Sequence, residues 1–301
     1  MDGIFNIYKQ KGFTSHDVVA VVRKTIQQKK VGHTGTLDPD AEGVLPICVG
    51  KGTKLADYIM NGKKSYHAVV TLGVTTTTED ASGEIIEKKE VVFEEQTIQK
   101  VVQSFLGTYE QIPPMYSAIK INGKKLYELA REGKEIERKA RKITIFEIQI
   151  TKFMPPNQFE IEVVCSKGTY IRTLCADIGK RLKCGAHMAS LLRTSSGMFS
   201  LDTAITLEQL KELAEKNQLQ KALLPLEKAL EQYHSIVISP KGNKLLYNGN
   251  PIGEQFFEKT KGTIKQGEII LGYDSKNTLI GIYKIITEKN RLYMKPLKIL
   301  L

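Results

Sequence analysis

Residues 32–43, GHTGTLDPDAEG, decide how the rest of the chain is interpreted. The stretch contains three glycines and one proline and lacks the apolar periodicity of helices and strands, so we expect an ordered loop. Asp38 lies directly before Pro39, and polar side chains surround it in sequence: His33, Thr34 and Thr36. Backbone N–H groups and hydroxyls of such a loop orient a carboxylate, which then serves as nucleophile or base. The alternative is that Asp38 only opens an Asp-Pro turn.

Regular elements are predicted on both sides of this loop. Alternating apolar residues predict strands at GIFNIYK (3–9) and SYHAVVTLG (65–73), and the apolar run VLPICVG (44–50) predicts a buried strand. Thr14 and Ser15 cap a segment with helical spacing of valines, and KLADYIM (54–60) is typical of a short helix. The order strand, helix, loop, strand therefore surrounds Asp38.

The remaining elements extend the same pattern to the C-terminus. Strands are predicted at ITIFEIQI (143–150) and QFEIEVVCS (158–166), and Asn122-Gly123 indicates a hairpin turn. Helices are predicted from Glu94 to Leu106 and at TYIRTLCADIGKRL (169–182), TLEQLKELAEK (206–216) and LLPLEKAL (223–230). We expect an α+β fold with a mixed, largely antiparallel sheet and flanking helices over residues 1–232. A small β domain follows over residues 233–301.

The composition restricts the classes of function. Forty-four Lys and Arg residues against 33 Asp and Glu give a net charge of +11, which favours a partner rich in phosphates, although an inert basic surface is an equal alternative. The four cysteines form no C-x-x-C pair or zinc-finger spacing, so no metal site is predicted. No apolar run approaches the roughly 18–20 residues of a membrane span, which predicts a soluble cytoplasmic protein without a membrane contact.

Five stretches resemble, in order, the motifs of the TruB family, the bacterial tRNA pseudouridine-55 synthases. The first is the catalytic motif, GHTGTLDPDAEGVLPICVGKGTK. KKSY (63–66), SKGTYIRTLCADIG (166–179) and CGAHMASLLRTSSG (184–197) are similar to core segments of the family. IPPMYSAIKINGKKLYELAREG is similar to its RNA-gripping insertion, here about residues 111–142, and residues 233–301 resemble the small RNA-binding domain that follows the core. Family members usually carry Lys-Pro where this chain has Lys9-Gln10.

The resemblance implies a site and a reaction. It implies that Asp38 is the catalytic carboxylate, that Arg172 pairs with it, and that Tyr66 stacks on the target uracil. The other residues that it implies for substrate binding surround the nucleotide or contact phosphates: His33, Tyr170, Leu191, Lys9, Lys54, Lys64 and Arg193. Isomerising uridine breaks the N1–C1′ bond and joins C5 to C1′ without net redox change, so no cofactor is expected. The base leaves its stack to react, as in other base-flipping enzymes.

The expected partner is the TΨC arm of tRNA, bound by a monomer without an obligate protein partner. An RNA-binding or RNA-folding protein without catalysis is one alternative. A guide-RNA-dependent synthase subunit is another. The intact GHTGTLDP loop with Tyr66 and Arg172 argues against the first, and the basic insertion with the short N-terminus argues against the second.

Overall fold

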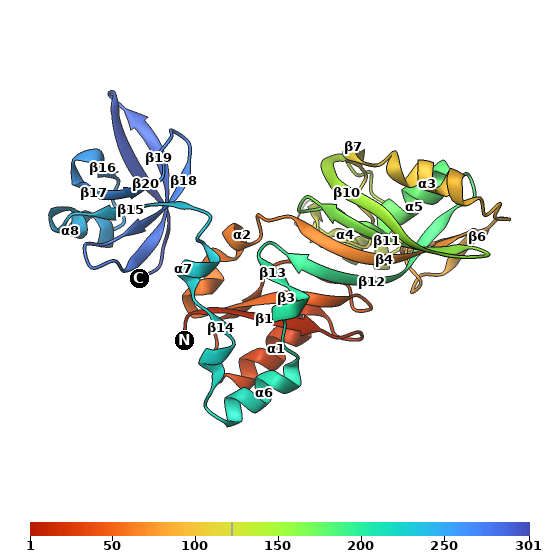
Figure 1. The fold of residues 1–301 in the computed structure, drawn as a ribbon, viewed down its shortest axis with the longest axis horizontal. Coiled ribbons are helices and arrows are strands. Elements are labelled where there is room, and N and C mark those ends of the chain that lie inside the picture. The colour runs from red at the N-terminus through yellow and green to blue at the C-terminus, as the bar shows by residue number, and fades with distance from the viewer. Residues whose placement is uncertain (122) are drawn as a thin grey trace.

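A ten-stranded sheet forms the larger part of the protein in the computed structural model, which describes residues 1–121 and 123–301 (Figure 1). Its strands follow the order β14-β1-β3-β12-β4-β11-β10-β7, with β2 beside β3 and β13 beside β12. The pairing of β3 with β12 is parallel, and the other pairs are antiparallel. The strands are β1 (Gly3–Lys9), β2 (Val31–His33), β3 (Glu42–Val49), β4 (Lys64–Leu72), β7 (Gly107–Gln111), β10 (Arg141–Met154), β11 (Gln158–Cys165), β12 (Ala186–Ser196), β13 (Phe199–Ser200) and β14 (Leu223–Leu224). The predicted mixed, largely antiparallel sheet is confirmed.

The two faces of this sheet bury different neighbours, because successive side chains of a strand point to opposite sides. Phe5 of β1 and Leu45 of β3 belong to a core that four helices cover. Ile4 and Cys48 of the same strands belong to a second core that residues from the C-terminal part of the chain complete. The four helices are α1 (Ser15–Thr25), α3 (Glu95–Gln103), α5 (Ile171–Arg181) and α6 (Leu207–Glu215). In Figure 1, α1 and α6 lie together at one end of the sheet, and α3 and α5 lie together at the other.

The cap of α1 follows the sequence prediction. Thr14 accepts a hydrogen bond from the Asp17 N–H, and the Asp17 carboxylate accepts one from the Thr14 N–H, which closes a capping box. The predicted helix from Glu94 to Leu106 is shorter, since α3 ends at Gln103 and the following Gly107, at φ +98°, begins β7. Three residues, 104–106, therefore separate the end of α3 from Gly107.

The insertion between β7 and β10 contains a small hairpin and a short helix. Strand β8 (Lys120–Ile121) pairs with β9 (Lys124–Lys125), and α4 (Leu126–Arg131) follows directly. The predicted turn at Asn122-Gly123 includes Asn122, which lies outside the described residues. Further short elements are β5 (Val74–Thr76) paired with β6 (Ile85–Lys88), α2 (Ala56–Ile59) and α7 (Leu226–Ala229).

The C-terminal part folds as a separate six-stranded sheet with its own apolar centre. Its strand order is β16-β20-β19-β18-β15-β17, and Ile236, Tyr283 and Met294 are fully buried in its core. The strands are β15 (His234–Ile238), β16 (Ile252–Gly253), β17 (Phe257–Lys261), β18 (Ile269–Tyr273), β19 (Leu279–Glu288) and β20 (Arg291–Ile299), and α8 (Asn243–Tyr247) packs beside them. A domain boundary at residue 232 stays a prediction, but the second sheet begins just after it.

Strand β12 and the segment LLPLEKAL also differ from the sequence analysis. Strand β12 was not predicted as a strand, because Ser190, Arg193 and Ser195 interrupt its apolar residues, yet it lies in the middle of the main sheet. The segment LLPLEKAL, predicted as helical, divides at Pro225 into β14 and the one-turn α7. Proline lacks the N–H that would continue either element, which explains the division.

Candidate active site

The loop that carries Asp38 connects β2 to β3 and is held by side chains from outside it. The hydroxyl of Ser15, the first residue of α1, accepts a hydrogen bond from the Leu37 N–H (2.9 Å) and donates one to the Leu37 carbonyl (3.2 Å). The ammonium of Lys9, the last residue of β1, donates to the carbonyls of Pro39 (3.0 Å) and Ala41 (2.5 Å). The main chain on both sides of Asp38 is therefore hydrogen-bonded to side chains of β1 and α1.

Arg193 of β12 also holds the loop, by hydrogen bonds to main-chain carbonyls. Its side chain is 1% exposed, its Nε donates to the Val44 carbonyl (2.7 Å), and its Nη1 donates to the Thr36 carbonyl (3.5 Å). Gly43, at φ +106°, packs so closely that a Cβ there would lie 2.2 Å from the Arg193 carbonyl oxygen. A glycine is therefore required where the loop enters β3.

Asp38 and Arg172 form a two-point ion pair. Arg172 Nε lies 3.0 Å from Asp38 Oδ2, and Nη2 lies 3.4 Å from Oδ1. The arginine is 5% exposed, whereas the Asp38 side chain is 38% exposed, so one side of the carboxylate is open to a substrate. Burial raises the pKa of Asp38, Arg172 opposes that shift, and the nearby Asp80 carboxylate adds to it. The arginine thus favours the ionised form that a nucleophile or base needs.

Further acceptors hold Arg172 in this orientation. Nη1 donates to the Thr78 carbonyl (3.1 Å) and to the Asp80 carboxylate (3.4 Å), and Nη2 donates to the Tyr116 carbonyl (2.8 Å). The sequence analysis missed Asp80. Its position in an acidic turn gave no signal, because the ion pair joins residues that lie 92 positions apart.

Tyr66 lies at the middle of the sheet, directly opposite Arg193 in the β4–β12 register. Directly opposed residues of antiparallel strands share a face, so both side chains point toward the helix-covered side where the Asp38 loop lies. Tyr66 is 7% exposed, and burial raises its pKa to about 12, with Arg193 opposing the shift. The phenol therefore keeps its proton at neutral pH.

Three other predicted residues lie around this centre. Leu191 shares the face of Tyr66, two residues before Arg193, and is buried. Tyr170 is the N-cap of α5, two positions before Arg172. His33 is half-buried, bonds the Gly35 carbonyl through Nδ1 (3.1 Å), and packs edge-on against His16 at 5.1 Å. Burial, His16 and Arg193 lower the pKa of His33, which favours a neutral ring.

The predicted phosphate contacts of the lysines need correction. Lys9 is fully buried, and its ammonium is used by the carbonyls of Gln10, Pro39 and Ala41, so it holds the loop and does not meet solvent. Lys64 is 7% exposed, and burial lowers its pKa to about 8, as it does for Lys9. Arg193 is likewise buried.

Lys54 is exposed, but it donates to the main-chain oxygens of Ile299 (2.9 Å) and Leu301 (3.4 Å). Lys54 therefore links the part of the chain that contains the ten-stranded sheet to the end of β20. The sequence did not indicate this contact. A phosphate contact by this residue stays a prediction.

Comparison with known proteins shows the family of the chain. The family described as TruB family pseudouridylate synthase (N terminal domain) matches residues 23–171, and the tRNA pseudouridylate synthase B C-terminal domain matches residues 172–231. The chain belongs to the TruB family of pseudouridylate synthases. Two relatives named tRNA pseudouridine synthase B are similar along their whole length. That of Alkaliphilus oremlandii is 48% identical over 300 residues, covering 100% of this chain and 99% of the relative, and that of Staphylococcus aureus is 45% identical, covering 99% of each.

Solved structures extend the TruB family likeness to larger assemblies. A chain of a Cbf5-Nop10-Gar1 complex superimposes with a TM-score of 0.78 and 28% identity, covering 99% of this chain and 85% of that one. A chain of an H/ACA RNP bound to a substrate RNA containing 2′-deoxyuridine superimposes with a TM-score of 0.75 and 26% identity, with the same coverage.

Among the described residues of this TruB family chain, no group of three or more His, Cys, Asp and Glu side chains could hold a metal ion. None of the helices in the described ranges is long and apolar enough to cross a membrane.

Proposed function

We propose that this chain isomerises one uridine of tRNA, position 55 in the TΨC loop, to pseudouridine, with Asp38 as the catalytic carboxylate. The observation that carries the proposal is the Asp38–Arg172 pair, in which a buried arginine fixes a partly exposed carboxylate through two contacts at 3.0 and 3.4 Å. The names of the relatives, all tRNA pseudouridine synthase B, give the substrate.

The reaction moves one bond and one proton. The N1–C1′ bond of the uridine breaks, the freed uracil turns, C5 bonds to C1′, and the C5 proton leaves while N1 gains one. Asp38 assists by attacking C1′ or by accepting a proton from the ribose. Arg172 keeps the carboxylate ionised and aimed. Tyr66, protonated and rigid on β4, would face the detached base together with Tyr170 and Leu191.

The charge distribution supports an RNA partner. Residues 111–142 contain nine basic and four acidic side chains, and residues 233–301 contain eleven basic and five acidic ones. The rest of the chain contains 24 of each, so the whole excess of +11 lies in the insertion and the C-terminal part. Surfaces that bind phosphates concentrate positive charge in this way, whereas in an inert basic protein the excess charge need not be concentrated in particular segments.

The insertion also combines cations with an aromatic ring. Lys125 Nζ lies 5.3 Å and the Arg131 guanidinium carbon 5.6 Å from the centre of the Tyr127 ring. Basic groups that flank an aromatic face suit single-stranded nucleotides, which present both phosphates and stacking surfaces. We therefore propose that this insertion grips the RNA, as the family resemblance implies.

Incubation of the purified protein with unmodified tRNA, followed by mapping of pseudouridine, tests reaction and position together. Asp38→Asn should make no product, whereas the matched variant Asp40→Asn, which removes an exposed carboxylate of the same loop, should remain active. Binding of tRNA without product formation by the wild-type protein would favour the alternative of an RNA-binding protein without catalysis.

A second experiment tests the RNA-gripping role of the insertion. Alanine replacement of Lys124, Lys125 and Arg131 should weaken tRNA binding and reduce its salt dependence, because each neutralised phosphate releases counterions. The control removes the same charge from exposed lysines outside both basic segments: Lys88, Lys100 and Lys152. Equal losses in both triple variants would show that only net charge matters.

We further propose that the protein acts in the cytoplasm as a monomer without an obligate protein partner. The insertion, the candidate catalytic residues and the basic C-terminal part are present in one chain, which supports activity of that chain alone. Light scattering of the active protein, with and without tRNA, measures its mass and tests this proposal.

A further inference from the structure

Gln111 is a buried polar residue at the point where the insertion leaves the main sheet. It is the last residue of β7 and is 2% exposed. Its Oε1 accepts a hydrogen bond from the Tyr170 N–H (2.9 Å), and its Nε2 donates to the Tyr170 carbonyl (3.0 Å) and to the Tyr109 hydroxyl (2.8 Å). One side-chain amide thus satisfies both main-chain groups of a single residue, as a neighbouring strand would.

The residue held in this way begins the helix that carries the catalytic arginine. Tyr170 precedes the first residue of α5, and no side chain of its own caps the helix. Its carbonyl also accepts the first helical hydrogen bond, from the Leu174 N–H (3.0 Å). The direction in which α5 starts therefore depends on the main chain of Tyr170, and both Tyr170 and Arg172 follow that direction.

A second contact joins the same two segments. The Tyr116 carbonyl, five residues after Gln111, accepts a hydrogen bond from Arg172 Nη2. The root of the insertion, residues 111–116, is therefore fastened to the first turn of α5 at two places. A displacement of the insertion would therefore move Tyr170 and Arg172 through these hydrogen bonds.

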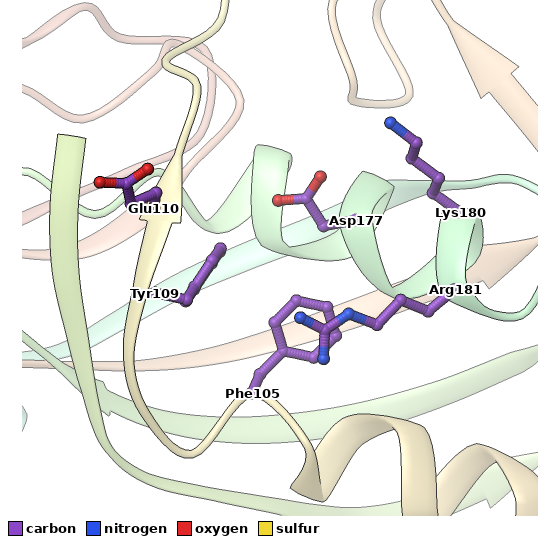
Figure 2. A pocket seen from close by; sticks show the side chains of 6 residues that line it. All are labelled: Phe105, Tyr109, Glu110, Asp177, Lys180 and Arg181. Carbon is purple, nitrogen blue, oxygen red and sulfur yellow. The ribbon is translucent and has the colours of Figure 1, made fainter. Parts of the chain in front are cut away.

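Aromatic packing supports Tyr109, the residue whose hydroxyl accepts a hydrogen bond from Gln111. Tyr109 lines a hollow of about 280 Å³ between β7 and α5, together with Phe105, Glu110, Asp177, Lys180 and Arg181 (Figure 2). The Phe105 and Tyr109 rings meet edge to face at 5.3 Å, and the Arg181 guanidinium stacks 3.7 Å from the centre of the Phe105 ring. The Tyr109 hydroxyl is therefore held in place to accept from Gln111.

We propose that Gln111 is a positioning residue, which fastens the root of the RNA-gripping insertion to the start of α5 and so keeps Tyr170 and Arg172 in place when RNA loads the insertion. This inference rests on the proposed function for its consequence in catalysis. The contact itself does not depend on that function, since, among the described residues, the Gln111 side chain bonds only to the Tyr170 main chain and the Tyr109 hydroxyl. The two are therefore tested by separate measurements.

Gln111→Leu removes all three hydrogen bonds with little change of volume. Hydrogen exchange of the Tyr170 amide should become faster, because that N–H loses its acceptor. The single-turnover rate at saturating tRNA should fall about 10- to 100-fold, since small displacements of catalytic groups have effects of this size. The Kd for tRNA should change little. The matched control is Gln103→Leu, which removes a glutamine bond to the Ile148 carbonyl (2.9 Å) away from α5's first turn, and it should leave the rate unchanged.

Gln111→Glu tests the same role if the leucine variant does not fold. A glutamate at this position still accepts from the Tyr170 N–H, but only its protonated form donates to the Tyr170 carbonyl. The ratio of its rate to the wild-type rate should therefore rise as the pH falls, and a merely structural role gives no such rise.

Distinct outcomes separate the inference from the proposed function. A wild-type rate for folded Gln111→Leu, or a ratio for Gln111→Glu that is independent of pH, would overturn the positioning role even if exchange at Tyr170 is faster. Absence of pseudouridine with the wild-type protein would overturn the proposed function, while faster exchange in Gln111→Leu would still confirm the contact.

Discussion

Replacing Arg172 separates the charge of this residue from its geometry. Arg172 makes five contacts with acceptors: Asp38 Oδ2, Asp38 Oδ1, Asp80 Oδ2 and the carbonyls of Thr78 and Tyr116. Lysine has three donors and no planar fork, so Arg172→Lys leaves at least two of these contacts unmade. At about 1–3 kcal/mol for each buried group without a partner, the free energy of unfolding should fall by about 2–6 kcal/mol.

The effect on catalysis follows from the same geometry. Arg172→Lys keeps a positive charge near Asp38 but not the two-point alignment, so the single-turnover rate should fall about 100-fold. Arg172→Met also removes the charge that opposes the raised pKa of Asp38. Because the carboxylate is the active form, a higher pKa should move the acidic limb of the pH–rate profile of Arg172→Met to higher pH, whereas Arg172→Lys should keep that limb near its wild-type position.

These measurements use single-turnover pseudouridine formation at saturating tRNA from pH 5 to 9, beside tRNA binding and urea unfolding of each variant. A wild-type rate for folded Arg172→Lys would refute the role of alignment. An acidic limb that stays in place for Arg172→Met would refute the electrostatic role.

Three further predictions concern Asp38, Lys9 and the C-terminal sheet. Asp38→Asn should abolish turnover and spare tRNA binding, because the amide keeps the shape of the side chain but is a poor nucleophile and base; substantial turnover by a folded variant would overturn the catalytic assignment. Lys9→Met should destabilise the protein by about 1–3 kcal/mol, because buried carbonyls of the loop lose their donor. Burial lowers the pKa of Lys9 from 10.5 to about 8. Between about pH 8 and pH 10.5, Lys9 is therefore protonated in the unfolded chain and neutral in the folded protein. Urea unfolding should therefore show wild-type stability rising with pH relative to the variant in this range, and parallel curves would contradict the assignment. Truncation after Gln232 should weaken tRNA binding and also lower the unfolding midpoint, because Leu271 and Ile282 complete the second core; an unchanged midpoint would show that this packing adds no stability.

The sequence predicted those features that depend on neighbours along the chain. The alternation of GIFNIYK gave β1, and the Thr14 cap gave the start of α1. Strand β12 was missed, because Ser190, Arg193 and Ser195 break its apolar pattern. Its central place in the sheet buries even Arg193, which no local pattern predicts. Burial there is set by strands β3 and β4 on either side, and these are distant in sequence.

The candidate site divides in the same way. The GHTGTLDP motif by itself determined that the chain carries one loop carboxylate, Asp38, and the family resemblance supplied Arg172 and Tyr66 as its partners. Only the tertiary structure decided that Asp80 shares Arg172, that Gln111 holds Tyr170, and that Lys9 and Lys64 lie inside the protein rather than on an RNA-facing surface. The physical reason is that the environment of a charge depends on which segments fold over it. Residue type and spacing along the chain do not contain that information.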